Sequence, residues 1–307
     1  MTNVFIDGSA GTTGLRIADR LAARQDISLI RLTEELRKDP SARKDAINSA
    51  DVVFLCLPDD AAKEAVGMIE NPQVKVIDTS TAHRTHPDWT YGFPELKGQR
   101  ERIRASKRIA NPGCHASGFV ALVAPLVQEG VIPGDLPLSS FSLTGYSGGG
   151  KKMIAQYEDP NRSPFLEGPR QYGLTQIHKH LPEMQAVCGL ERLPVFCPIV
   201  GDFYSGMEVT VPLFADWVKG SPDEIRQLYR DYYATGLVRM AEGEDPEGML
   251  SAAAFSGRDD LQIGVWGNEE RILLVARFDN LGKGASGAAI QNMNILMGLS
   301  EDTGLNV

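Results

Sequence analysis

The sequence lacks several features that would assign it to a protein class at once. No apolar run approaches the roughly 18–20 residues needed to span a bilayer, and the first residues carry no basic region typical of a targeting signal. The four cysteines show no C-x-x-C spacing and only five histidines occur, which excludes the usual zinc-binding and disulfide-rich patterns. We therefore expect a cytoplasmic protein with reduced thiols, no membrane anchor and no metal site.

An excess of positive charge is also missing. The chain carries 31 Lys and Arg against 40 Asp and Glu, for a net charge of −9. This balance argues against nucleic acid or an anionic membrane surface as a partner, because both select for basic patches. An anionic small-molecule substrate remains compatible with it, since a few local Arg and Lys side chains suffice.

The chain has 307 residues, more than one hydrophobic core usually serves, so we expect two domains. In the first third, apolar runs alternate with segments of helical spacing, which predicts an α/β fold with a parallel, doubly wound sheet. After residue 112 the pattern is β-rich with long irregular stretches, notably 147–176, and predicts an α+β domain with a mainly antiparallel sheet. Segment 285–299 returns to helical spacing, so we predict domains at 1–112 plus 284–307 and at 113–283.

A glycine-rich turn follows the first predicted strand and opens the first predicted helix. Its spacing is G-x-x-G-x-x-G, formed by Gly8, Ser9, Ala10, Gly11, Thr12, Thr13 and Gly14. Glycine permits a tight turn and close approach of a pyrophosphate to the helix N-terminus. The alternative is an ordinary strand-to-helix turn, but the strand–turn–helix context favours a Rossmann-type dinucleotide-binding domain.

The end of the second predicted strand bears on the choice of dinucleotide. NAD usually calls for an acidic residue there, to bind the ribose hydroxyls. Here the strand ends at Thr33, with Glu34 beyond it and Arg31, Arg37 and Lys38 nearby. Thr33 is suited to bind a 2′-phosphate that the basic residues neutralise, so we favour NADP, the alternative being solvated surface charges.

Cys114 is the candidate nucleophile. Pro112 and Gly113 force a turn, after which a helix is predicted, so Cys114 sits at a helix N-terminus. The free N–H groups and the helix dipole there stabilise a thiolate, and we expect a depressed pKa for the Cys114 thiol. The other three cysteines fit the role of small buried hydrophobes, most clearly Cys56 within an apolar run.

A histidine pair in the second predicted domain supplies candidate partners for the cysteine. His178 and His180 lie two residues apart, which on an extended segment points them to opposite faces. One of them would act as general acid/base, with His180 preferred, and Glu183 would orient an imidazole or bind substrate. His115 directly follows the nucleophile and is expected to point away, about 100° round the helix.

Eight segments spread over nearly the whole chain resemble one enzyme family, the N-acetyl-γ-glutamyl-phosphate reductases of arginine biosynthesis, in their shorter, second type. The segments are GSAGTTG (8–14), VVFLCLPDDAAKEA (52–65), VIDTSTAHR (76–84), YGFPEL (91–96), NPGCHASG (111–118), GYSGGGKK (145–152), HKHLPEM (178–184) and DNLGKGASGAAIQNMN (279–294). The resemblance implies that Cys114 attacks the acyl phosphate and that NADPH reduces the resulting thioester to N-acetyl-glutamate 5-semialdehyde. It also implies a homo-oligomer, a dimer or tetramer, with an NADP-binding first domain and a catalytic and oligomerisation second domain.

Further site residues follow from the resemblance. Arg84 would handle the substrate phosphate, for which a planar bidentate donor is suited, and Asn280 would lie near the nicotinamide carboxamide. The glycine-rich loop before Lys151 is expected to hold an anion through backbone N–H groups. The longer type of the family carries an acidic residue where His83 stands, so details of the phosphate site are not transferred between the two types.

Two alternatives differ in the use of the same fold. An enzyme similar to aspartate-semialdehyde dehydrogenase would reduce another acyl phosphate, against which the H-x-H-x-P-E motif argues. A non-catalytic NADP-binding redox sensor would have lost Cys114 or the histidine pair, and both are present. A thiol hydrolase gives the glycine-rich loop no role.

Overall fold

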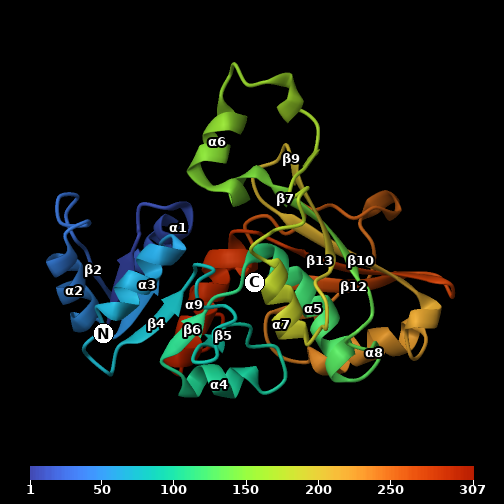
Figure 1. Ribbon diagram of the computed structural model, residues 1–307, viewed down its shortest axis with the longest axis horizontal. Coiled ribbons are helices and arrows are strands. Elements are labelled where there is room, and N and C mark those ends of the chain that lie inside the picture. The colour runs from blue at the N-terminus through green and yellow to red at the C-terminus, as the bar shows by residue number, and fades with distance from the viewer. The chain divides into compact units, whose positions relative to one another are not determined.

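The computed structural model describes residues 1–307 and divides the chain into two units (Figure 1). The first unit comprises Met1–Pro94, Gly98–Pro112 and Ala285–Leu305. The second comprises Glu95–Lys97, Gly113–Gly284 and Asn306–Val307. None of the helices is both long enough and apolar enough to cross a membrane.

A six-stranded parallel sheet forms the centre of the first unit, in the order β2-β1-β3-β4-β6-β5. Its strands are β1 (Thr2–Asp7), β2 (Ile27–Ile30), β3 (Val52–Leu55), β4 (Lys75–Asp78), β5 (Thr90–Tyr91) and β6 (Arg108–Ala110). Its helices are α1 (Thr12–Ala22), α2 (Pro40–Ser49), α3 (Asp59–Gly67), α4 (Gln99–Ala105) and α9 (Gly287–Leu296). Every residue of β3 is buried, as expected for a strand covered on both faces, and the predicted doubly wound sheet is confirmed.

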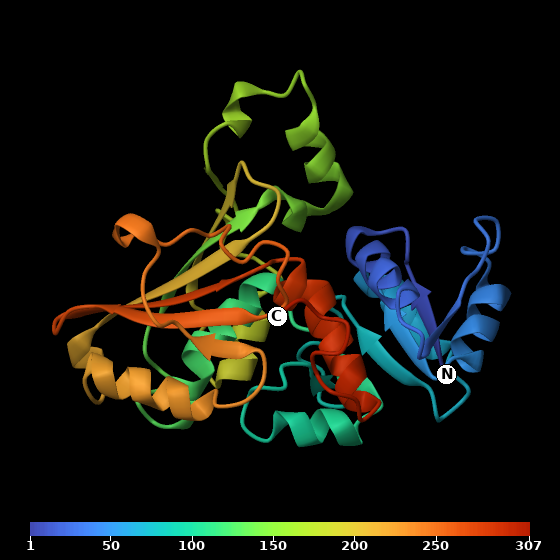
Figure 2. The same ribbon diagram turned by 180° about the vertical axis from the view of Figure 1, so that it is seen from behind.

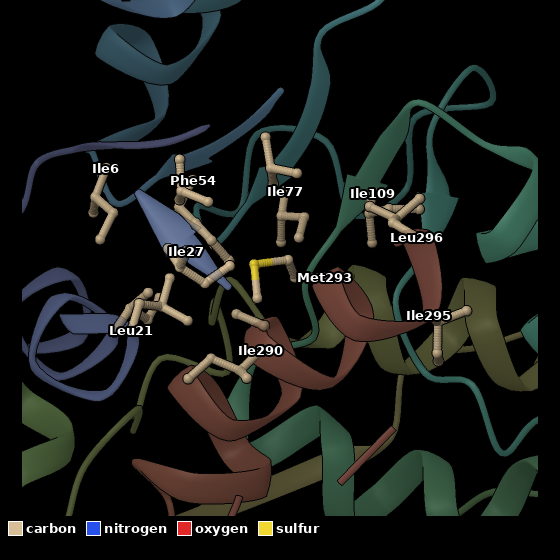
Figure 3. Close-up of a cluster of buried hydrophobic side chains, with 14 of the residues drawn as sticks. Ile6, Leu21, Ile27, Phe54, Ile77, Ile109, Ile290, Met293, Ile295 and Leu296 are labelled. Atoms are coloured by element: carbon tan, nitrogen blue, oxygen red, sulfur yellow. The ribbon is translucent and has the colours of Figure 1, made fainter. Parts of the chain in front are cut away.

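Apolar side chains cover both faces of this sheet. On one face, α1 and α9 pack against the strands, and Figure 3 shows Met293 pointing from α9 toward Phe54 and Ile77. On the other face, Ile47 of α2 and residues of α3 pack against the alternate side chains of the same strands. The C-terminal helix therefore completes the core of the unit that the N-terminal strands begin.

A seven-stranded sheet organises the second unit, in the order β11-β12-β13-β10-β7-β9-β8. Its strands are β7 (Ser139–Gly145), β8 (Arg170–Gln171), β9 (Val195–Gly201), β10 (Met207–Phe214), β11 (Val238–Met240), β12 (Leu261–Gly267) and β13 (Arg271–Phe278). Its helices are α5 (Cys114–Gln128), α6 (Gly150–Glu158), α7 (Leu181–Cys188) and α8 (Pro222–Tyr232). Four of the six strand pairs are antiparallel and two are parallel, so the sheet is mixed with the predicted antiparallel majority.

Helix α5 is the buried centre of the second unit. Its residues are buried from His115 to Leu126, which makes it a rigid support for the cysteine at its first position. Pro125 lies inside the helix and has no N–H, so the carbonyl of Ala121 loses its usual donor. The Tyr233 hydroxyl donates a hydrogen bond of 2.8 Å to that carbonyl and replaces the missing one.

The connection from β7 to β8 stands out from the second sheet, as both ribbon views show (Figure 2). Predicted to be irregular, it contains α6 and a small cluster in which the rings of Tyr146 and Tyr157 stack 4.7 Å apart. Tyr157 and Leu166 supply the buried apolar contacts of this excursion. These few side chains are enough to stabilise one short helix. The charge-rich composition of the segment gave no sign of this helix in the sequence.

Candidate functional site

The glycine-rich turn adopts the geometry that its sequence requires. Gly8 has φ +88°, a conformation that side chains disfavour, and a Cβ there would overlap the carbonyl oxygen of Cys56. A Cβ on Gly14 would lie 2.5 Å from the Gly8 oxygen. Gly11 is the N-cap of α1 and has no side chain that would occupy the helix N-terminus. The turn therefore leaves backbone N–H groups accessible to a phosphate.

A pocket of about 690 Å³ opens beside this turn within the first unit. Gly8, Ser9 and Ala10 line it at one side, and the ends of β1 and β2 form its floor. The basic residues noted in the sequence also line it, together with Glu34: they are Arg31, Arg37 and Lys38. The volume and the mixed apolar and basic lining suit the adenosine half of a dinucleotide that carries an additional phosphate.

Two features of this pocket depart from the sequence reasoning. Thr33 lies outside the lining. Its hydroxyl donates to the Glu35 carboxylate, and the pKa of that exposed carboxylate is lowered first by a backbone hydrogen bond and then by the Thr33 hydroxyl. Asp7, which the sequence reasoning did not consider, forms a buried ion pair in the pocket with Arg43, at 2.9 Å. Burial raises the pKa of Asp7 despite that partner.

Arg84 lies at the carboxyl edge of the first sheet, after β4. Its Nε donates to the carbonyl of Asn111 and its Nη2 donates to the carbonyl of Thr79, and each hydrogen bond is 3.1 Å long. The preceding His83 stacks on Trp89 at 4.1 Å, and its Nδ1 lies 2.6 Å from the fully buried carboxylate of Asp78. The loop that carries Arg84 is thus fixed from both sides.

Cys114 is the first residue of α5 and is half-buried. The preceding Gly113 is the N-cap, without a side chain to compete for the free N–H groups. Glu183 Oε1 accepts a hydrogen bond of 2.8 Å from the Gly113 N–H, and Glu183 is itself buried. Glu183, predicted to orient an imidazole or bind substrate, therefore holds the turn that presents the cysteine.

The imidazoles of His178 and His180 lie on one side of their segment, with ring centroids 4.9 Å apart. The prediction that they point to opposite faces is wrong. The segment is not extended: His180 has φ −83° and ψ −17° as the N-cap of α7, and the Leu181 N–H bonds back to the His178 carbonyl. Side chains two residues apart do not alternate in such a turn.

His115 joins the same cluster. Its ring lies 5.3 Å from that of His180 and 5.9 Å from that of His178. Its Nδ1 is 2.6 Å from the Ser142 hydroxyl and its Nε2 is 2.6 Å from the Tyr172 hydroxyl. Sequence reasoning set His115 aside and missed Tyr172 and Ser142, because no local spacing connects residues on α5, β7 and the end of β8.

Burial lowers the pKa of two of these histidines. Complete burial lowers the pKa of His115 to about 3, with smaller electrostatic contributions from His178 and Lys179. Partial burial and Lys179 lower the pKa of His178. His115 therefore stays neutral under ordinary conditions.

Two further predicted residues lie in the second unit. Asn280 is buried: its Oδ1 accepts from the Gly206 N–H at 2.9 Å and its Nδ2 donates to the Ser147 hydroxyl at 3.0 Å. It thereby fixes the glycine-rich loop that leads into α6. Lys151 follows in the first turn of α6, with its side chain exposed.

Two family models match the chain. Residues 114–280 match the semialdehyde dehydrogenase dimerisation domain, and residues 29–106 match the semialdehyde dehydrogenase NAD-binding domain. N-acetyl-γ-glutamyl-phosphate reductases of Brucella ovis and Brucella canis are each 47% identical over 305 residues, covering 96% of this chain and 98% of the relative.

Solved structures with the same fold are aspartate semialdehyde dehydrogenases. The Vibrio cholerae enzyme II, complexed with ASA, matches with a TM-score of 0.71 at 16% identity, covering 97% of this chain and 98% of the other. The Candida albicans enzyme with NADP matches with a TM-score of 0.67 at 16% identity, with the same coverage. At this identity the likeness establishes the fold alone.

Proposed function

The chain belongs to the N-acetyl-γ-glutamyl-phosphate reductase family, and we propose from this membership that it reduces N-acetyl-γ-glutamyl phosphate to N-acetyl-L-glutamate 5-semialdehyde with NADPH, in arginine biosynthesis. The observation that carries the proposal is a half-buried cysteine at the N-terminus of a rigid helix, in the same unit as a cluster of imidazoles.

Cys114 is the proposed nucleophile. Its sulfur attacks the γ-acyl carbon, the C–O bond to phosphate breaks, and a thioester forms with release of phosphate. The helix N-terminus favours the anionic form of the sulfur. A thioester divides one difficult reduction into two easier steps, and the same sulfur leaves as thiolate when the aldehyde forms.

Proton transfer is assigned to the histidine pair, with His180 preferred. The acid/base protonates the oxygen that becomes negative on reduction and takes the proton back when the thiohemiacetal collapses. His180 is buried and forms the start of α7, which holds it more precisely than a loop would hold a side chain. His178 supports it from 4.9 Å away.

The anionic groups of the substrate need cationic or N–H partners. We assign Arg84 to the substrate phosphate because its guanidinium lies on a fixed loop at the carboxyl edge of a parallel sheet, where ligands of such sheets bind. The loop ending at Lys151 offers backbone N–H groups and one exposed cation for a second anionic group. Glu183 supports the site through Gly113.

The residues of the first unit fit NADPH. Bound NADPH supplies the hydride that reduces the thioester. The turn from Gly8 to Gly14 receives the pyrophosphate, and it can be this tight because a Cβ at Gly8 or Gly14 would overlap the backbone of Cys56 or of Gly8 itself. Arg31, Arg37 and Lys38 in the pocket suit the 2′-phosphate. We assign Asn280 to the nicotinamide end through the loop that it fixes.

We further propose a homo-oligomer, a dimer or tetramer, built on the second sheet, and a location in the cytoplasm. Apolar side chains are exposed on strands β7, β9, β10 and β13: they are Phe141, Val195, Phe214 and Leu273. Exposed apolar groups gathered on a sheet are typical of an interface, and the matching family model is described as a dimerisation domain. Light scattering on the purified protein tests this part, and a monomer at micromolar concentration would contradict it.

One assay tests substrate, cofactor and reaction together. Purified protein is given N-acetyl-glutamate 5-semialdehyde, NADP⁺ and phosphate, and NADPH formation is followed by absorbance. We expect turnover that requires phosphate and is much slower with NAD⁺. Parallel reactions with aspartate semialdehyde serve as the control, and faster turnover of that compound would replace the proposed substrate.

A further inference from the structure

His115 is a buried titratable residue for which the proposed reaction has no use. It is 3% exposed and lies in the first turn of α5, directly after the nucleophile. With a pKa of about 3 it neither gives nor takes a proton near neutral pH. A polar ring is nevertheless kept in the interior there, and both of its nitrogens have hydroxyl partners at 2.6 Å.

A neutral imidazole has one N–H donor and one acceptor nitrogen. The hydroxyls of Ser142 and Tyr172 must therefore play different parts. If the Ser142 hydroxyl donates to Nδ1, the Nε2–H donates to the Tyr172 oxygen, and the Tyr172 proton is available to donate elsewhere. In the reverse arrangement, the Tyr172 hydroxyl donates its proton to Nε2 of His115 and cannot donate to another group.

Tyr172 lies near both the Cys114 sulfur and His178, so the direction of its hydroxyl proton affects the proposed site. Its hydroxyl stays protonated, because burial and the charge of Cys114 both raise its pKa. The tyrosine is half-buried, and its backbone N–H bonds to the Pro198 carbonyl at 3.0 Å, which anchors it at the edge of the second sheet. Its ring lies 6.0 Å from that of His178.

The ring of His115 also supports the candidate acid/base pair directly. It contacts both imidazoles, and Phe196 packs against His115 at 5.2 Å and against His178 at 5.0 Å. A change in the orientation of His115 would therefore displace Tyr172 and the histidine pair together. Groups that must lie within a fraction of an ångström of a reacting geometry need such support.

We propose that His115 is a positioning residue: a permanently neutral imidazole, fixed by Ser142, that orients the Tyr172 hydroxyl and holds the rings of His178 and His180. The inference rests on the proposed function and deepens it. His115 takes no part in proton transfer and acts only through these neighbours.

The test is a double-mutant cycle. His115→Phe keeps a buried ring but removes both nitrogens, and Tyr172→Phe removes one hydroxyl. We expect each to lower kcat by about tenfold to a hundredfold, the range for one hydrogen bond to a reacting group, with the KM for NADPH unchanged. The double variant should be little worse than His115→Phe, because both changes break the same link. Independent, multiplying losses would overturn the proposal, as would a His115→Phe enzyme within twofold of wild type.

Two further variants keep the test decisive if His115→Phe folds poorly. His115→Gln retains a donor and an acceptor and should recover part of the lost rate. Ser142→Ala should slow turnover, whereas Ser140→Ala should not: Ser140 is buried two residues away on β7, and its hydroxyl has no partner. Equal effects of these two alanines would contradict the orienting role of Ser142.

A readout without substrate separates this proposal from the proposed function. The rate of Cys114 alkylation by iodoacetamide at pH 7 should fall by about threefold or more in His115→Phe and Tyr172→Phe, since a hydroxyl near the sulfur is lost or displaced. An unchanged alkylation rate in both variants would refute it. Wild-type protein that alkylates as expected but turns over no acyl phosphate would instead refute the proposed function alone.

Discussion

The contrast between Cys114 and Cys56 gives a quantitative prediction about thiol reactivity. Cys56 follows β3 and is half-buried by its exposed area, but desolvation of its thiol raises the pKa from 9.0 to about 12, with the carboxylates of Asp78 and Asp7 adding to the rise. At pH 7 the thiolate fraction of Cys56 is therefore about a thousandfold below that of an ordinary thiol. Cys114 has a similar intermediate exposure but stands at a helix N-terminus, where the helix dipole favours the thiolate.

The rate difference is smaller than the difference in thiolate fraction. A thiolate of higher pKa is intrinsically more nucleophilic, with a Brønsted coefficient of about 0.4–0.5. For a pKa about three units higher, this greater nucleophilicity increases the rate constant of the thiolate about twentyfold. Cys56 should therefore alkylate about fiftyfold more slowly than an ordinary thiol. Burial also raises the pKa of the Cys188 thiol, so Cys188 should alkylate as slowly as Cys56. The half-buried Cys197 provides a reference rate within the same protein.

The assay is partial alkylation by iodoacetamide at pH 7, followed by peptide mapping. We expect the Cys114 peptide to be labelled first, and Cys56 and Cys188 last. In denaturant the four rates should converge, which controls for differences between peptides. Labelling of Cys56 at a rate comparable to that of Cys114 in the folded protein would refute the electrostatic reasoning.

Three other perturbations have defined outcomes. Cys114→Ser should keep NADPH binding, measured by fluorescence, and lose reduction by at least about a thousandfold, so near-wild-type turnover would contradict the mechanism. Gly8→Ala should cost more than about 2 kcal/mol in urea unfolding, because a Cβ would overlap a carbonyl at φ +88°, whereas Gly98→Ala, at φ +72° with open space around it, should cost about 1 kcal/mol. The pKa of His115 is lowered to about 3 from an ordinary 6.5, so its contribution to stability is complete above pH 6.5 and is lost as the pH falls toward 3, by up to about 1.4 kcal/mol per pH unit. Urea titrations should show this slope in the wild type and a shallower one in His115→Phe, and equal slopes would be inconsistent with the buried neutral ring.

The first unit was predictable because its sequence signals are local. The apolar run at Val52–Leu55 is buried on both faces, and Gly8 has the positive φ that its place after a strand indicates. The 285–299 segment showed helical spacing, and α9 indeed packs its apolar residues on the sheet. In each case, periodicity of a few residues decides which side chains are buried.

The candidate site was predictable only in its components. The sequence identified Cys114 and the histidine pair, but the relative direction of the two imidazoles depends on where α7 begins. A start one residue later would let the segment remain extended and would send the rings apart. The turn at 178–181 is closed by the hydrogen bond from the Leu181 N–H to the His178 carbonyl. No residue pattern in the sequence predicted this bond.

The different parts proposed for His115 and His178 follow from burial, which sequence does not reveal. A ring that is completely buried, with hydroxyls on both nitrogens, loses the ability to titrate and becomes a fixed polar spacer. A half-buried ring next to it keeps access to protons, although its pKa is lowered. His115 and His178, whose ring centroids lie 5.9 Å apart, therefore differ in their ability to exchange protons, which is why we assign support to His115 and include His178 in the proposed acid/base pair. Because His115 directly follows Cys114 in the chain, the helix that carries the proposed nucleophile also carries the residue that we propose orients its partners.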